Sequence, residues 1–186
     1  MADRGGSPTV LVLTAVTGVL LGTSVFLGAK ITNPPPLDWM DVEYYDILGQ
    51  SMPAVPLETV SGVPVTPEVL AGTTHVVVLV LSGCRACEEV YPVLREVSER
   101  LSVVLVGKGE RAEFVAKVAE AGLTCPAAFD SAGALAKRLG VTGYPTAILV
   151  DQAGRILKAG SVRRILERAE HGRRAVQDGR TVGLRG

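Results

Sequence analysis

The sequence lacks an excess of charge of either sign, and it is poor in cysteine. Its 186 residues contain 19 Lys and Arg against 19 Asp and Glu, so the composition gives no electrostatic reason to expect nucleic-acid binding. Three cysteines are too few for a scaffold held together by disulfides, and an odd number leaves one thiol over. The thiols are therefore expected either to carry out chemistry or to be buried as small apolar side chains. The length suits one domain of ordinary size plus an appendage.

Charged residues are absent from the stretch between Arg4 and Lys30. Residues 8–31 supply about the 20 apolar residues that a helix needs to cross a bilayer core. A cleaved signal peptide is the alternative, but its apolar core is usually only about 7–15 residues long. Cleavage after Ala29 would also place Leu27 where a small residue is required. We therefore predict an uncleaved transmembrane anchor.

Lysine and arginine are also missing between Lys30 and Arg85, whereas this stretch contains several Asp and Glu residues. Basic residues near a membrane span tend to stay on the cytoplasmic side, and Arg4 and the initiator amine both lie on the N-terminal side. We predict a single-pass protein of the cell membrane with a cytoplasmic N-terminus and an extracytoplasmic globular domain. Disulfides persist in compartments outside the cytoplasm.

The region after the anchor is rich in proline and acidic residues, which indicates a linker with an extended Pro34–Pro36 segment. Its aromatic residues either lie at the membrane interface or pack on the surface of the following domain. These are Trp39, Tyr44 and Tyr45. The predicted organisation is an anchor over 1–31, a linker over 32–47, a globular domain over 48–177 and a flexible tail over 178–186.

Within the globular domain, strand and helix patterns alternate, which predicts an α/β sheet with helices on both faces and an antiparallel edge. Short apolar pieces broken by Gly62 and Pro64 predict a hairpin over 54–70. The predicted strands are 75–82, 102–108, 126–130, 145–151 and 155–160. The predicted helices are 85–101, 110–122, 131–140 and 161–177.

Cys84 and Cys87 form a CxxC pair where a strand passes into a helix. A helix start presents unpaired N–H groups that favour a thiolate, and the cationic Arg85 adds to this effect. Three residues apart on one helical face, the sulfurs can close a small disulfide, with Cys84 at the exposed end. A zinc site requires a second pair of ligands. No second pair with suitable spacing is found among the remaining candidates, which are Cys125, His75 and His171. A redox pair is favoured over two inert cysteines, because such a junction seldom hides a thiol.

Four motifs follow one another between about Leu48 and Glu170. They are "LGQSMPAVPLETVSGVPV", "SGCRACEEVYP" with Pro92 eight positions after Cys84, "GVTGYPTAILVDQAGRI", and "ILKAGSVRRILE". Together they resemble the thioredoxin fold, specifically its membrane-tethered TlpA/MauD-like branch.

The resemblance implies a thioredoxin-like α/β fold, a central mixed sheet flanked by helices, after the transmembrane helix. It implies a thiol–disulfide oxidoreductase in which Cys84 attacks and Cys87 resolves the mixed disulfide. It also places a cis-proline at Pro145, beside Cys84, and lets the backbone of Tyr144 pair with a substrate segment. Pro92 is expected to kink the helix of the CxxC pair, because proline lacks an N–H.

The sequence departs from the family pattern at three positions. Gly83 stands where an aromatic residue often precedes the first cysteine, and Val78 and Val90 stand where related proteins carry acids that serve proton transfer to the deeper thiol. Arg85 is expected to stabilise the thiolate and make the disulfide more oxidising, which favours donating or isomerising disulfides. The direction of electron flow stays open.

The resemblance further implies a cysteine-containing protein substrate in a maturation process and a membrane thiol carrier as redox partner, with no cofactor and no metal. The alternative is a thioredoxin-fold assembly or structural subunit of a membrane complex, without essential redox turnover. Cys125 is expected to be buried, and the alternative is a third reactive thiol. The basic stretch after Arg155 is read as a solvated helix face rather than a docking surface.

Overall fold

The computed structural model describes residues 43–62, 64–65 and 72–177, and these belong to one compact unit. The predicted anchor, most of the predicted linker and the predicted tail lie outside the described residues. Within the described ranges, no helix is long and apolar enough to cross a membrane. The anchor therefore stays a prediction.

Six strands form one mixed sheet in the order β1-β4-β3-β2-β5-β6. Strand β2 is central, parallel to β3 on one side and antiparallel to β5 on the other. Strand β4 is parallel to β3, and β6 continues the sheet antiparallel to β5. The bounds are β1 Glu58–Thr59, β2 His75–Leu81, β3 Val103–Lys108, β4 Ala127–Phe129, β5 Thr146–Val150 and β6 Ile156–Gly160. The predicted mixed sheet is confirmed.

Strand β2 shows why the sequence forms this sheet. Its continuous run of mostly β-branched residues is buried along almost its whole length, as expected of a strand covered on both faces. Successive side chains point to opposite faces. Val78 therefore joins one core cluster, and Val77 joins the other.

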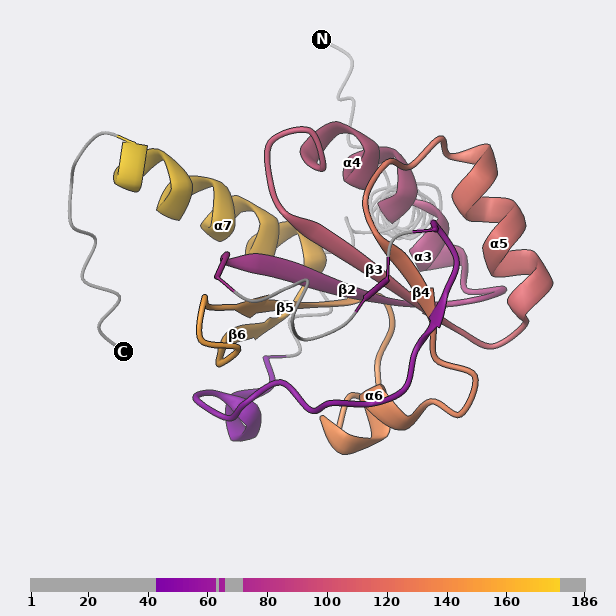
Figure 1. Ribbon diagram of the computed structural model, residues 1–186, viewed down its shortest axis with the longest axis horizontal. Helices are drawn as coiled ribbons and strands as arrows, with labels where there is room; N and C mark the ends of the chain where they lie inside the picture. Colours follow the sequence, from indigo (N-terminus) through magenta and orange to yellow (C-terminus); the bar gives the residue numbers. More distant parts are fainter. Residues whose placement is uncertain (1–42, 63, 66–71, 178–186) are drawn as a thin grey trace, which may run out of the picture. The chain divides into compact units, whose positions relative to one another are not determined.

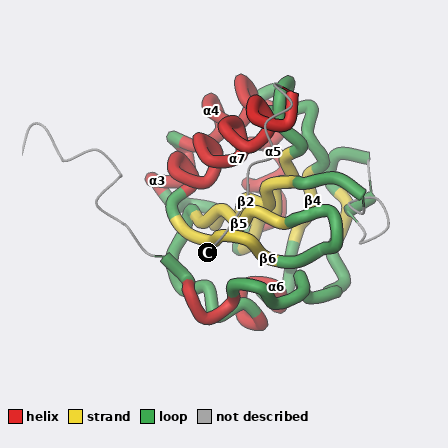
Figure 2. The backbone as a smooth tube through the Cα atoms, turned by 90° about the vertical axis from the view of Figure 1, so that its left-hand side faces the viewer, coloured by secondary structure: helices red, strands yellow, loops and turns green. Residues whose placement is uncertain are grey.

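Helices cover the two faces unequally, as Figures 1 and 2 show. Side chains of α4, α5 and α7 pack in the cluster with Val78, and those of α6 pack in the cluster with Val77. The helices are α3 Arg85–Glu88, α4 Val90–Val97, α5 Arg111–Glu120, α6 Ala134–Arg138 and α7 Val162–Gln177. Helices thus lie on both faces, in agreement with the predicted architecture.

The single helix predicted over 85–101 is instead two helices, because α3 and α4 are separated at Glu89. Pro92 is the third residue of α4 and has no N–H to donate to the carbonyl of Glu88, four residues earlier. Glu89 keeps backbone angles in the α-helical region, with φ of −73° and ψ of −15°, so the interruption is local. It agrees with the expected distortion of this helix by Pro92. The CxxC pair thus lies at the short helix α3, with Cys84 as its N-cap.

The N-terminal segment lies along the edge strand β6. Ile47, in the 3₁₀ helix η2 Tyr45–Ile47, is buried, and the N–H of Gly49 donates to the carbonyl of Ile156 at 2.7 Å. The N–H of Tyr44 donates to the carbonyl of Ala159 at 3.3 Å. The linker aromatics were expected either at the membrane interface or on the domain surface, and Tyr44 packs on the domain. Trp39 lies outside the described residues.

The hairpin predicted over 54–70 is not seen in the described part of that segment. Strand β1 has no partner there and pairs antiparallel with β4, with Glu58 opposite Phe129. Residues 63 and 66–71 lie outside the described residues. The hairpin therefore stays a prediction there, and the pairing that the structure describes for β1 is with the distant strand β4.

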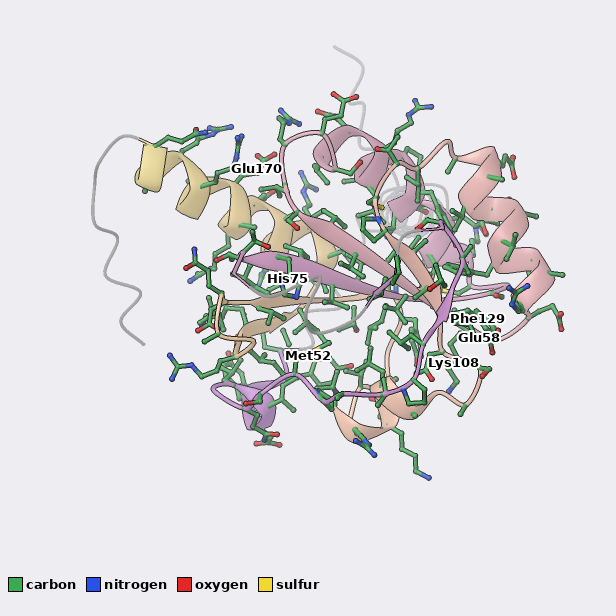
Figure 3. All side chains as sticks on the ribbon, viewed as in Figure 1. Met52, Glu58, His75, Lys108, Phe129 and Glu170 are labelled. Atoms are coloured by element: carbon green, nitrogen blue, oxygen red, sulfur yellow. A yellow bond between two sulfur atoms is a disulfide. The ribbon has the colours of Figure 1, made fainter. Side chains whose placement is uncertain are left out.

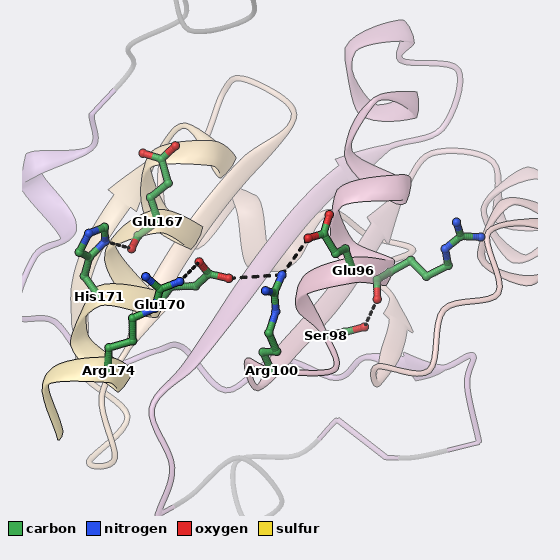
Figure 4. A network of polar contacts seen from close by, with 8 residues as sticks. Glu96, Ser98, Arg100, Glu167, Glu170, His171 and Arg174 are labelled. Carbon is green, nitrogen blue, oxygen red and sulfur yellow. Dashed lines mark hydrogen bonds and ion pairs between the residues drawn. The ribbon is translucent and has the colours of Figure 1, made fainter. Parts of the chain in front are cut away.

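An ion-pair network joins the end of the α4 segment to α7 (Figure 4). Arg100 contacts Glu96 at 2.9 Å and Glu170 at 3.7 Å. Glu170 also contacts Arg174 at 3.8 Å, and Arg163 pairs with Glu167 on the same helix. Several arginines of the basic C-terminal stretch thus contact acids within the domain, which favours the solvated helix face.

Candidate functional site

A tight turn connects the end of β2 to the CxxC pair. The N–H of Ser82 donates to the carbonyl of Lys108 at 2.9 Å, and the N–H of Cys84 donates back to the carbonyl of Leu81 at 3.2 Å. Gly83 lies between them with φ of +71°, a backbone conformation that side chains with a Cβ rarely adopt. An aromatic residue at this position would be strained, which gives a local reason for the departure from the family pattern.

Cys84 caps the helix that the turn begins. Its sulfur accepts a hydrogen bond from the N–H of Cys87 at 3.3 Å, and the two cysteines form a disulfide with a Cα–Cα distance of 5.3 Å. Cys84 is partly exposed, whereas Cys87 is only 1 % exposed. An incoming sulfur therefore has access to Cys84 first, as an attacking thiol requires.

The loop before β5 brings two further predicted site residues to the pair. The Tyr144–Pro145 peptide bond is cis, as expected from the resemblance. The carbonyl oxygen of Tyr144 lies 3.8 Å from the sulfur of Cys84, although sixty positions separate the two residues. Antiparallel pairing of β5 with β2 produces this contact, because it returns the chain to the end of β2 that carries the cysteines.

The phenol of Tyr144 is partly buried. Burial raises its pKa, and the nearby Asp130 and Tyr44 raise it further. Asp130 is itself buried and accepts hydrogen bonds from the N–H groups of Ala134 at 2.9 Å and Leu135 at 2.8 Å. These bonds compensate its burial and hold the start of α6. The ring of Tyr144 thus remains neutral at physiological pH.

The deeper cysteine lies among apolar side chains. Val78 and Val90 belong to the same buried cluster as Cys87, with exposures of 0 % and 6 %. The positions where related proteins carry acids thus contribute only packing here. Arg85 is exposed and forms no hydrogen bond or ion pair with any described residue. Its predicted role would act through its charge alone.

Sequence reasoning missed Glu113 on α5. Its carboxylate accepts a hydrogen bond at 2.9 Å from the N–H of Gly83, the residue directly before Cys84. With Glu88, it also adds to the effect of burial in raising the pKa of Tyr91 to about 12. No local motif marks Glu113, because an acid in the first turn of an exposed helix is common. Only the packing of α5 against β3 brings it to the turn.

Cys125 is a free, buried thiol, 5 % exposed, in the cluster that contains Cys87. Burial raises its pKa, which disfavours the reactive thiolate form. This agrees with the expectation of a small apolar side chain.

Neither histidine contacts the cysteine pair in the described part of the chain. His75 is buried, its Nδ1 lies 3.1 Å from the carbonyl of Thr73, and burial lowers its pKa. It lines a cavity of about 350 Å³ with Met52 and apolar residues of the sheet, and Figure 3 labels both residues. This cavity contains none of the predicted site residues. Among the residues described, no group of three His, Cys, Asp or Glu is placed to hold a metal ion.

The sequence of this chain is similar to those of known proteins. The Redoxin family model matches residues 47–172. Methylamine utilization protein MauD of Methylophilus methylotrophus is 25 % identical over 150 residues, covering 78 % of this chain and 71 % of that protein. MauD of Methylobacillus flagellatus is 27 % identical over 103 residues, covering 53 % of this chain and 50 % of the relative, so the chain spans about half of its length.

A solved structure supports the same fold. The thioredoxin domain of a thiol-disulfide oxidoreductase from Bacteroides vulgatus matches with a TM-score of 0.60 at 17 % identity, over 67 % of this chain and 96 % of that domain. The mixed sheet, the CxxC turn and the adjacent cis-proline define a thioredoxin-like protein. This chain belongs to the Redoxin family, whose model covers most of it. The resemblance to the thioredoxin fold and to MauD is thereby confirmed.

Proposed function

We propose that this protein is a membrane-anchored, extracytoplasmic thiol–disulfide oxidoreductase that exchanges the Cys84–Cys87 disulfide with a partner protein. The observation that carries the proposal is the disulfide at a helix start, with one accessible and one buried sulfur. The Redoxin family match and the solved thioredoxin-like relatives support the class of chemistry.

The exchange proceeds in two steps. In the reducing direction, the Cys84 thiolate attacks one sulfur of a substrate disulfide, forms a mixed disulfide and releases the other substrate sulfur as a thiolate. The Cys87 thiolate then attacks the Cys84 sulfur, closes the internal disulfide and releases the second substrate thiolate. Two electrons pass from the pair to the substrate, and the oxidising direction is the exact reverse. The N–H of Cys87 stabilises negative charge on the Cys84 sulfur through its hydrogen bond.

Tyr144 and Pro145 guide the substrate in this proposal. The carbonyl of Tyr144 lies beside the Cys84 sulfur, where an extended substrate segment can pair with the loop as an added strand. Such pairing binds the main chain and tolerates different side chains. Arg85 modulates the pair through its positive charge and favours the thiolate.

The cellular setting is the sequence-based part of the proposal. The apolar stretch over 8–31 and the lack of basic residues between Lys30 and Arg85 support a single anchor with a cytoplasmic N-terminus. The MauD relatives are named for methylamine utilization. A dedicated role in maturing one partner protein is what the resemblance to the MauD-like group suggests for this chain. A membrane thiol carrier would renew the redox state of the pair.

Thiol trapping tests the function. In Cys87→Ser, the mixed disulfide on Cys84 cannot be resolved, so a partner should remain attached and should be released by dithiothreitol. Cys125→Ser is the matched control, since it removes a cysteine outside the pair, and it should trap nothing. Absence of any trapped partner with Cys87→Ser, together with an ordinary pKa for Cys84, would refute the enzyme and favour the assembly subunit. The measured reduction potential of the pair then decides the direction of exchange.

A further inference from the structure

The loop that carries Tyr144 is held by a residue from the N-terminal segment. The hydroxyl oxygen of Tyr44 accepts hydrogen bonds from the N–H of Gly143 at 3.1 Å and from the N–H of Thr142 at 3.4 Å. Burial raises the pKa of this hydroxyl, but the hydrogen bonds from the loop, that of the Gly143 N–H first, outweigh burial and lower it overall. The Tyr44 hydroxyl thus accepts hydrogen bonds from two consecutive N–H groups of the loop.

The same loop is fixed from its carbonyl side. The hydroxyl of Thr146, which is 3 % exposed, donates to the carbonyl of Gly143 at 2.8 Å. Both the N–H and the carbonyl of Gly143 are therefore held, and the next residue is Tyr144, whose carbonyl lies 3.8 Å from the Cys84 sulfur. The direction of that carbonyl depends on the backbone immediately before it.

Tyr44 can hold the loop because its own backbone is held. Its N–H donates to the carbonyl of Ala159 on β6, and its side chain packs against a core cluster. The neighbouring Tyr45 has the same chemistry but is 66 % exposed, and its hydroxyl donates to Glu43 instead. Of the two adjacent tyrosines, Tyr44 thus contacts the loop, whereas the hydroxyl of Tyr45 bonds to Glu43.

We propose that Tyr44 is a positioning residue for substrate recognition, because its hydroxyl sets the loop that presents the Tyr144 carbonyl to the substrate backbone. The inference rests on the proposed function and deepens it. Substrates that pair with the loop depend on Tyr44, whereas small disulfides that need only the Cys84 sulfur do not. A merely structural role for Tyr44 would affect both kinds of substrate alike.

Two probes that release the same leaving group, thionitrobenzoate, distinguish a role in substrate recognition from a merely structural role. The first is an extended peptide whose single cysteine is linked by a disulfide to thionitrobenzoate, and the second is dithiobis(nitrobenzoate), which has no peptide backbone. In each case the Cys84 thiolate of the reduced full chain attacks the disulfide and releases coloured thionitrobenzoate. With the peptide, attack at its cysteine sulfur forms the mixed disulfide, and Cys87 then closes the internal disulfide and frees the peptide thiol.

Tyr44→Phe should lower the second-order rate constant of thionitrobenzoate release from the peptide about tenfold, which corresponds to ~1.4 kcal/mol and is the size of one hydrogen bond. The rate with the small disulfide should stay within about twofold, and Tyr45→Phe should change neither rate. Thr146→Val, which removes the bond to the Gly143 carbonyl, should give the same peptide-selective loss and serves as an independent test if Tyr44→Phe folds poorly.

The inference is overturned if Tyr44→Phe and Thr146→Val react with the peptide like the wild-type chain, or if both probes slow equally. Failure of the proposed function would look different. The wild-type chain itself would then release no more thionitrobenzoate from either probe than Cys84→Ser does.

Discussion

Replacing Gly107 by alanine should destabilise the domain, because a Cβ at this position of β3 has no room. It would lie 2.4 Å from Cδ2 of Phe114, far inside an ordinary contact. The ring cannot easily retreat, since Phe114 is 1 % exposed and packs against Phe129 with ring centroids 5.8 Å apart. The strain must be relieved by moving α5 or by distorting the ring.

The magnitude follows from two opposing effects. Overpacking a core typically costs about 1–3 kcal/mol. Replacing glycine by alanine inside a strand returns roughly 0.5–1 kcal/mol of conformational entropy. We expect a net loss of about 1–2 kcal/mol. A shift of α5 would also weaken the hydrogen bond from Gly83 to Glu113, next to the cysteine pair.

Thermal unfolding of the full chain in mild detergent, followed by circular dichroism, measures this loss. Gly172→Ala is the matched control, because Gly172 lies in helix α7 and no heavy atom is within 4 Å of its added Cβ. It should stabilise by about 0.5–1 kcal/mol. Phe114→Leu in the Gly107→Ala background should recover part of the loss as a favourable coupling. A midpoint for Gly107→Ala at or above that of the wild-type chain would refute the close approach.

Two further predictions concern buried ionisable groups. In the folded, oxidised chain, Cys125 should not react with dithiobis(nitrobenzoate) at pH 8, because burial raises its pKa, and one thiol should become reactive on unfolding. Reaction of the folded chain at the unfolded rate would contradict its burial, and Cys125→Ser should show no thiol in either state. Tyr91 has a pKa raised from 10.0 to about 12, chiefly by burial, so the neutral phenol stabilises the fold fully below pH 10 and this contribution is lost between pH 10 and 12. The loss amounts to roughly 2–3 kcal/mol. Unfolding midpoints should therefore fall more steeply with pH for the wild-type chain than for Tyr91→Phe, and parallel curves would show that Tyr91 does not titrate late.

The sequence was sufficient for features that depend on neighbours along the chain. The β-branched run of β2 predicted a buried strand because its pattern leaves no polar face. The spacing of Cys84 and Cys87 predicted a pair on one turn, since residues three apart on a helix are neighbours. Pro92 predicted a distorted helix, and the helix is interrupted at Glu89, three residues before it.

The pairing of β1 with β4 was not predicted from the sequence. Turn residues at Gly62 and Pro64 indicate that the chain changes direction, but they do not say which strand β1 will pair with. Edge strands pair with whatever partner the rest of the sheet leaves open, and β4 offered that edge. The cis bond before Pro145 was expected from family resemblance, because the residues alone are equally compatible with a plain turn.

The cysteine pair and its place at a helix start were determined by the sequence itself, because both depend on residues a few positions apart. Only the tertiary structure decided what surrounds the pair. The sheet order returns Tyr144 to Cys84, the packing of α5 brings Glu113 to the preceding turn, and the segment along β6 carries Tyr44 to the loop before β5. Contacts between residues so distant in the chain leave no local pattern, since each depends on how separate elements pack.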